Sequence, residues 1–119
     1  MPAAAALKVM VVDDQACMRE VIRRTLQDSG IRDIRTRASA AEALADIRQN
    51  RVHLIISDFN MPDMDGLQLL KEVRGDPVIN KTVFMMLTGR PDRQLVEEAA
   101  ALRINNFLKK PFTPAGPGG

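Results

Sequence analysis

The stretch from Val52 to Gly66, VHLIISDFNMPDMDG, decides how the rest of the sequence is interpreted. Residues 52–57 form a mostly apolar run with the length of a strand, and so continuous a run is typical of a strand buried on both faces of a parallel sheet. Asp58 follows this run directly, with no basic residue beside it in the sequence. Because a buried charge needs a partner, we expect residues distant in the chain to meet Asp58.

The rest of the chain alternates between strand and helix patterns. The predicted strands and helices are, in order, strand 7–12, helix 17–30, strand 33–38, helix 39–50, strand 52–57, helix 66–77, strand 82–87, helix 90–103 and strand 105–110. This alternation predicts an α/β protein with a doubly wound, five-stranded parallel sheet and helices on both faces. The right-handed crossover rule favours the strand order 2-1-3-4-5, which puts the two more polar strands, the second and the fifth, at the edges. Ligands bind where the winding reverses, between the first and third strands.

Carboxylates converge on that point. Asp13 and Asp14 end the first strand, and the ends of parallel strands share one edge, so both should lie near Asp58. Three such groups repel one another and raise one another's pKa, and a hard divalent cation such as Mg²⁺ removes that penalty. The alternative is that these acids merely cap helices or loops, and Asp14 could cap the helix that follows it. Because Asp13 and Asp14 are joined by Asp58 at the place where the winding of the sheet reverses, a metal site is the favoured interpretation.

The same edge should also carry donors for an anion. The fourth strand ends in Thr88 and Gly89, and the fifth ends in Lys110. A hydroxyl, a backbone amide and an ammonium suit a phosphoryl group. A carboxylate can attack phosphorus to form an aspartyl phosphate, and Asp58 is the best candidate because its strand is central. The only histidine, His53, belongs to the body of the third strand, where we expect a structural role.

Four motifs in this order resemble those of response-regulator receiver domains, with the single-domain chemotaxis receivers of the CheY type as the most similar by eye. The motifs are VVDD (11–14), ISDFNMPDMDG (56–66), LTG (87–89) and KKPF (109–112). The resemblance covers about residues 7–113 without an obvious insertion. It implies the flavodoxin-like fold of CheY and a role in two-component signalling. It also implies that the protein is not an enzyme beyond self-catalysed phosphoryl transfer and slow autodephosphorylation.

The resemblance further implies individual roles around the acceptor. Asp58 takes the phosphoryl group from a histidine kinase. Mg²⁺ is bound by Asp14, Asp58 and the backbone carbonyl of Asn60, while Asp13 contributes to the site, often through water. Asn60 and Arg90 occupy positions that tune the lifetime of the phosphate.

The resemblance also implies a switch. Thr88 hydrogen-bonds the phosphoryl group, and Lys110 forms an ion pair with it. Phe107 stands at the position of the switch aromatic, which turns inward as Thr88 moves toward the phosphate; a phenylalanine there fills the pocket but offers no hydroxyl. Phosphorylation would then shift the surface formed by the fourth helix and fifth strand toward an active arrangement that controls an output protein.

The sequence departs from the family after its last strand. A receiver continues with a fifth helix, whereas this chain reads PFTPAGPGG (111–119), in which proline and glycine disfavour a helix. Three explanations are open: the chain is a fragment of a longer response regulator, it forms a homodimer or exchanges elements, or a partner supplies the missing layer. We expect a disordered tail at 1–6, a receiver domain at 7–113 and a disordered tail at 114–119. The resemblance also implies a cis bond between Lys110 and Pro111.

Composition limits the other classes of function. The chain has 119 residues, enough for one domain, and its 17 basic residues nearly balance its 15 acidic ones. Tryptophan and tyrosine are absent, which argues against stacking on nucleic-acid bases. No apolar stretch has the length of a membrane span, and the single cysteine, Cys17, cannot form an internal disulfide. We therefore expect a cytoplasmic protein with no direct nucleic-acid partner and no membrane insertion, in which Cys17 packs against its neighbours.

Two rival functions remain. A phosphatase of the haloacid dehalogenase type would need a second aspartate where this chain has Asn60, as well as a longer chain with a cap. A phosphate-independent interaction module, or a nucleotide or nucleic-acid binder, could use the basic side chains of the first helix and second strand. These are Arg23, Arg24, Arg32, Arg35, Arg37 and Arg48. The chain has no glycine-rich phosphate loop, so a solvated basic face is the favoured interpretation.

Overall fold

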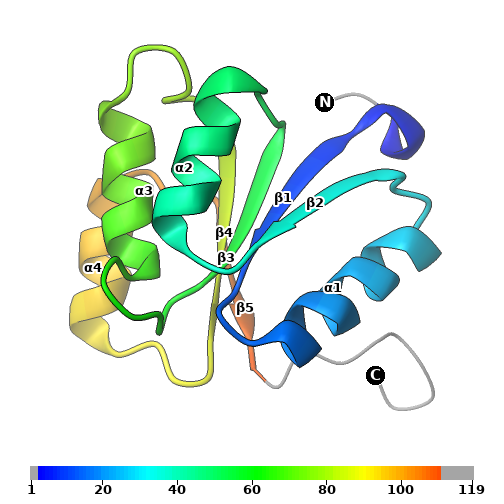
Figure 1. Ribbon diagram of the computed structural model, residues 1–119. Coiled ribbons are helices and arrows are strands. Elements are labelled where there is room, and N and C mark those ends of the chain that lie inside the picture. Colours follow the sequence, from blue (N-terminus) through cyan, green and yellow to red (C-terminus); the bar gives the residue numbers. More distant parts are fainter. Residues whose placement is uncertain (1–2, 111–119) are drawn as a thin grey trace.

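The computed structural model describes residues 3–110, which form a five-stranded parallel sheet in the order β2-β1-β3-β4-β5 (Figure 1). The strands are β1 (Lys8–Val12), β2 (Asp33–Arg37), β3 (Leu54–Asp58), β4 (Val83–Thr88) and β5 (Asn106–Lys109). The helices are α1 (Ala16–Asp28), α2 (Ala40–Gln49), α3 (Gly66–Gly75) and α4 (Arg93–Ala101), with a short 3-10 helix η1 (Ala4–Ala6) before the sheet. The predicted fold class, strand order and edge strands are confirmed.

The sheet is buried on both faces because its strands alternate their side chains between two cores. Met10 and Val12 of β1 belong to the core under α2, α3 and α4, whereas Val9 and Val11 belong to the core under α1. All four are fully buried. Figure 1 shows the same division, with α2, α3 and α4 grouped on one side of the sheet and α1 on the other. The central strands therefore read as continuous apolar runs.

The third strand begins two residues later than predicted and includes Asp58 itself. At this boundary the ring Nδ1 of His53 accepts the backbone N–H of Lys8 at 2.9 Å, and the backbone N–H of His53 donates to the carbonyl of Lys8 at 2.8 Å. The residue pairing between β1 and β3 starts one residue later, with Val9 opposite Leu54. His53 thus has a structural contact at the opposite end of the strand from Asp58.

Other expectations fall at the ends of the chain or on its surface. The Lys110–Pro111 bond and the segment 111–119, including the missing fifth helix, lie outside the described residues. Three residues of the expected N-terminal tail form η1, and the division of the chain into domain and tails stays a prediction. Cys17 is exposed, so the expectation that it packs is wrong. Within residues 3–110, no helix is long and apolar enough to cross a membrane.

Candidate functional site

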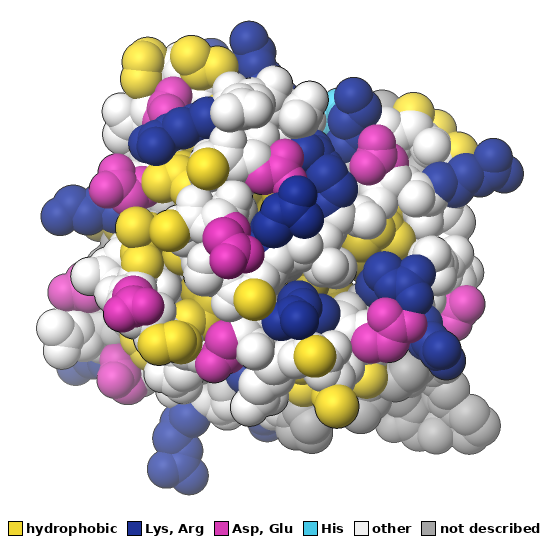
Figure 2. Space-filling view, viewed as in Figure 1, with side chains coloured by type: hydrophobic (Ala, Val, Ile, Leu, Met, Phe, Trp, Pro, Cys, Tyr) yellow, Lys and Arg dark blue, Asp and Glu magenta, His cyan; other side chains and the backbone are white. Residues whose placement is uncertain are grey.

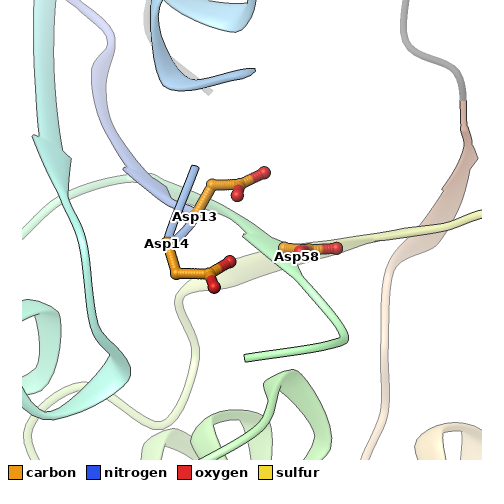
Figure 3. A group of neighbouring side chains, drawn as sticks. All are labelled: Asp13, Asp14 and Asp58. Atoms are coloured by element: carbon orange, nitrogen blue, oxygen red, sulfur yellow. The ribbon is translucent and has the colours of Figure 1, made fainter. Parts of the chain in front are cut away.

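The carboxyl ends of β1 and β3 bring three aspartates together. Val12 pairs with Ser57 in the β1–β3 register, so the residues that follow them, Asp13 and Asp58, emerge side by side. One carboxylate oxygen from each of Asp13, Asp14 and Asp58 lies within 4.8 Å of the others. In Figure 3 the three carboxylates extend from the strand ends in the same direction. The structure thus gives these residues the arrangement of a possible cation site.

Asp13 is buried and has one carboxylate oxygen without a partner. Its side chain is fully buried; Oδ1 accepts the backbone N–H of Gln15 at 2.9 Å, while Oδ2 is buried without a hydrogen-bond partner. Burial raises the pKa of Asp13 above its ordinary value, and the charges of Asp58 and Asp14 add to this rise. A buried oxygen with no donor suits a cation, and an all-carboxylate donor set suits a hard one.

The turn between β1 and α1 fixes the direction of these acids. Gln15, not Asp14, is the residue that precedes α1 as its N-cap, so Asp14 does not have the capping role considered as an alternative. Asp14 is exposed. Arg19, one turn into α1, donates from Nη1 to the backbone carbonyl of Asp13 at 2.7 Å. Sequence reasoning missed Arg19, because its reach depends on how α1 lies against the strand.

Lys110 supplies the distant partner of Asp58. Its Nζ lies 2.6 Å from Oδ1 of Asp58, which is 2% exposed. The backbone N–H of Lys110 also donates to the carbonyl of Thr88 at 3.0 Å, which fixes the lysine beside the end of β4. The buried carboxylate is therefore neutralised by a cation that comes from beyond the neighbouring strand.

Thr88 lies at the end of β4 with a buried side chain, 4% exposed. Its Oγ1 accepts the backbone N–H of Arg90 at 3.4 Å, a long hydrogen bond that leaves the hydroxyl's own proton free to be donated. The side chains of Arg90 and Asn60 are both exposed, near the ends of their strands. These positions border the aspartates without forming part of the buried cluster.

The loop after Asp58 is held close to the strand by a glycine. A Cβ at Gly66 would lie 2.6 Å from the carbonyl oxygen of Asp58 and 3.0 Å from the Cα of Phe59. The N–H of Gly66 donates to the carbonyl of Phe59 at 2.9 Å. Only glycine permits this approach, so Gly66 sets the path of the loop that would present the carbonyl of Asn60.

Phe107 lies in β5 opposite Met86, next to the fourth strand. Its ring is partly buried and packs against the core under α2, α3 and α4. The ring therefore already contacts the side of the sheet that carries α4. The structure describes Phe107 in one arrangement, and its role as a switch stays a prediction.

Taken together, the edge of the sheet places a candidate cation site beside a candidate anion site. The carboxylates of Asp13 and Asp58 are buried there, and the ammonium of Lys110 lies 2.6 Å from Asp58. Thr88 ends the neighbouring strand one residue beyond Leu87, the register partner of Asp58. A group that carries negative oxygens and is attached at Asp58 would meet the ammonium.

Comparison with known proteins agrees with this arrangement. The family model of the response regulator receiver domain matches residues 9–116. A Rhizobium etli protein named probable chemotaxis protein CheY is 41% identical over 113 residues, which cover 95% of this chain and 88% of that protein. Chemotaxis protein CheY1 of Helicobacter pylori is 36% identical over 109 residues, covering 91% of this chain and 88% of that protein. The structure of chemotaxis protein CheY4 of Vibrio cholerae superposes with a TM-score of 0.84 at 38% identity, covering 91% of this chain and 89% of that one.

These matches favour a receiver domain over the phosphatase of the haloacid dehalogenase type. They span nearly the whole chain and include the strand ends that carry the candidate site. A receiver of this kind takes part in two-component signalling. The chain belongs to the family of response-regulator receiver domains and is CheY-like.

Proposed function

We propose that this receiver accepts a phosphoryl group from a histidine kinase on Asp58 and uses it to control a protein partner. The observation that carries the proposal is the convergence at one sheet edge of buried Asp13 and Asp58 with Lys110, whose Nζ is 2.6 Å from Asp58. Such a site provides both a nucleophilic carboxylate and the charges that a transferring phosphoryl group requires.

The donor set of the three aspartates fits Mg²⁺, and the buried, unpartnered Oδ2 of Asp13 supports a resident cation. Asp14, Asp58 and the backbone carbonyl of Asn60 would hold the ion, and Asp13 would contribute to its surroundings. When bound, Mg²⁺ supplies positive charge to the phosphoryl oxygens during transfer.

The reaction itself is a displacement at phosphorus. A carboxylate oxygen of Asp58 forms a bond to phosphorus as the bond between phosphorus and the donor's imidazole nitrogen breaks, and the imidazole leaves with the electron pair. The ammonium of Lys110 neutralises the negative oxygens of the phosphoryl group during its transfer. The hydroxyl of Thr88 donates a hydrogen bond to the phosphoryl group once it is attached to Asp58. Hydrolysis of the aspartyl phosphate by water returns Asp58, at a rate that we expect Asn60 and Arg90 to tune through their exposed positions.

Phosphorylation would alter the surface of α4 and β5. Lys110 is bound to Asp58 in the unphosphorylated chain, and a phosphoryl group would give its ammonium a second set of negative oxygens. Thr88 joins β4 to the segment that leads into α4, so movement of its hydroxyl toward the phosphate shifts that segment. Phe107, beside Met86 in the sheet, would follow by turning further inward. Both end states are discrete packings, and the phosphate shifts their populations.

The names of the relatives, chemotaxis proteins of several bacteria, favour an output in chemotaxis, in the cytoplasm. The output partner is then a protein. The basic side of α1 and β2 gives little support to a nucleic-acid ligand, because Arg35 and Arg37 both form ion pairs with Asp46, at 2.5 and 2.6 Å. Arg48 pairs with Asp76 at 3.0 Å. These three guanidinium groups share two carboxylates, which lowers the positive charge available to the phosphates of a nucleic acid.

The test is the intact mass of the protein after incubation with acetyl phosphate. With Mg²⁺ we expect the mass of one added phosphoryl group, and with a chelator in place of Mg²⁺ we expect almost none. Asp14→Asn is a useful companion variant because Asp14 is exposed and its loss should weaken metal binding without disturbing the core. Equal phosphorylation with and without Mg²⁺ would contradict the metal assignment. No phosphorylation of the folded protein would favour a phosphate-independent interaction module.

A further inference from the structure

A groove runs between α3 and α4, on the flank of α4 away from β5. Two hollows form it, with volumes of about 380 and 260 Å³. They adjoin, because Leu67 of α3 and Glu98 of α4 line both. One end of the groove reaches Phe59, the residue directly after Asp58, and the other reaches Leu102 at the end of α4.

The floor of the groove is apolar. Leu67, Leu102 and Phe59 are partly buried side chains that pack on the core beneath and keep one side open to the groove. Leu95, at 5% exposure, completes the floor between the two helices. A concave strip of leucine and phenylalanine can accept the side chains of one face of a helix.

The rim of the groove is acidic and lacks neutralising partners. Asp65, Asp92 and Glu98 line it against a single cation, Lys71. Over the residues that the structure describes, none of these three carboxylates forms an ion pair. Figure 2 shows the consequence on the surface over α3 and α4, where acidic side chains are interspersed with hydrophobic ones.

The three carboxylates of the rim make few hydrogen bonds within the fold. Asp65 and Asp92 accept one backbone N–H each, from Gln68 and Leu95, at 2.8 Å as helix caps. Those bonds occupy one oxygen of each carboxylate. Glu98 is exposed and receives only the side-chain amide of Gln94, at 3.3 Å. The rim therefore carries three carboxylates against one lysine, and only Asp65 and Asp92 are partly offset by the helix N-termini that they cap.

We propose that the α3–α4 groove docks a basic amphipathic segment of a partner protein, with apolar side chains on the floor and lysine or arginine side chains against Asp65, Asp92 and Glu98. The charge of the rim selects this occupant, since an acidic peptide or a nucleic acid would be repelled. The site differs from the α4–β5 surface proposed for the phosphorylated state, and it exists in the unphosphorylated chain. Its test therefore does not depend on phosphorylation of Asp58.

The probe is a fluorescently labelled peptide of leucine and lysine patterned as an amphipathic helix, titrated with unphosphorylated protein and followed by fluorescence anisotropy. A peptide of the same composition in scrambled order has the same charge without an apolar face. We expect saturable binding of the patterned peptide, weaker binding of the scrambled one, and amide shift changes in the protein's NMR spectrum confined to α3, α4 and the loop at Phe59.

Two charge reversals make the test specific to the groove. Glu98→Lys changes the rim, while Glu42→Lys changes the net charge equally on α2, where Glu42 is exposed and lies outside the groove. We expect Glu98→Lys to raise the Kd of the patterned peptide roughly ten-fold more than Glu42→Lys does. Equal effects of the two reversals, equal binding of the scrambled peptide, or shifts spread over the whole surface would each overturn the proposal in favour of nonspecific attraction.

Discussion

The ammonium of Lys110 and the carboxylate of Asp58 lie 2.6 Å apart, although β4 lies between β3, which ends at Asp58, and β5, which Lys110 follows directly. Asp58 is almost fully buried, and Lys110 is its one ion-pair partner in the described part of the chain. The contact therefore does two things. It neutralises a buried charge in the resting state, and it places an ammonium where a phosphoryl group on Asp58 would need one.

Replacement of Lys110 should destabilise the fold, because the buried carboxylate of Asp58 would lose its ion-pair partner. We expect Lys110→Met to lower the free energy of unfolding by about 1–3 kcal/mol, because a buried charge left without its partner loses compensation. Urea unfolding at neutral pH without metal measures this loss. In an Asp58→Asn background the same substitution should cost much less, and equal costs in the two backgrounds would show that the ion pair does not account for the effect.

Asp13 should destabilise the metal-free fold. Burial raises its pKa in the folded state, so the folded protein holds the proton more tightly than the unfolded chain does. Stability is then lost as pH rises from the ordinary value near 3.8 through the raised value, and the loss is complete above it. Asp13→Asn keeps an acceptor for the N–H of Gln15 and removes the charge. We expect this variant to be more stable than the parent at neutral pH with a chelator present.

The pH dependence is the control for that prediction. The advantage of Asp13→Asn should shrink as the pH falls through the raised pKa and vanish below the ordinary value near 3.8, where the parent carboxyl is protonated in both states. Urea unfolding at a series of pH values measures it. An advantage that is constant with pH would assign the effect to packing and not to charge.

Gly66 should be intolerant of a side chain. A Cβ at this position would lie 2.6 Å from the carbonyl oxygen of Asp58, so Gly66→Ala must displace the loop that follows Asp58. We expect a loss of about 1–3 kcal/mol in unfolding free energy, together with reduced phosphorylation of Asp58. Gly75→Ala, at the end of α3, is the matched control because no atom lies within 4 Å of the added Cβ. Equal stabilities of the two variants would contradict the assigned role of Gly66.

Arg74 should stabilise the turn that follows the C-terminal end of α4. Its guanidinium connects the end of α3 to the loop before β4 and to the turn between α4 and β5. Its acceptors are the backbone carbonyls of Asn80, Thr82, Leu102 and Arg103 and the side-chain oxygen of Asn105. Burial lowers the pKa of Arg74, yet the guanidinium stays charged at neutral pH.

Because a lysine lacks the planar fork that serves these acceptors, even Arg74→Lys should cost about 2 kcal/mol or more in unfolding free energy. Hydrogen exchange should rise in the turn at 102–105 before it rises in β1. A uniform rise across the sheet would show that Arg74 stabilises the fold as a whole and not this turn in particular.

Much of the fold could be predicted because the strands are continuous apolar runs with helices between them. That pattern allows few topologies, and the crossover rule then determines the strand order. The predicted strand boundaries are less accurate than the strand order where a side chain forms a hydrogen bond with the backbone. At the start of β3 the ring of His53 accepts the backbone N–H of Lys8, a side-chain contact that an apolar pattern does not predict.

The site was predictable to the extent that it consists of strand ends. Parallel strands place Asp13, Asp58 and Thr88 at one edge whatever the details of the loops. Arg19 and Arg74 could not be found in the same way, because each acts on backbone carbonyls that only the packed helices bring within reach. The exposed position of Cys17 was missed for a similar reason, since the orientation of α1 decides which of its residues face the sheet.

The central claim is that Asp58, and not a neighbouring aspartate, accepts the phosphoryl group. The most direct measurement is to phosphorylate the protein with acetyl phosphate and Mg²⁺, reduce the aspartyl phosphate with borohydride, and locate the resulting homoserine by peptide mass spectrometry. The account predicts homoserine at position 58 alone, and none in Asp58→Asn. Homoserine at position 13 or 14 in the wild-type protein, or an unchanged yield in the variant, would contradict it.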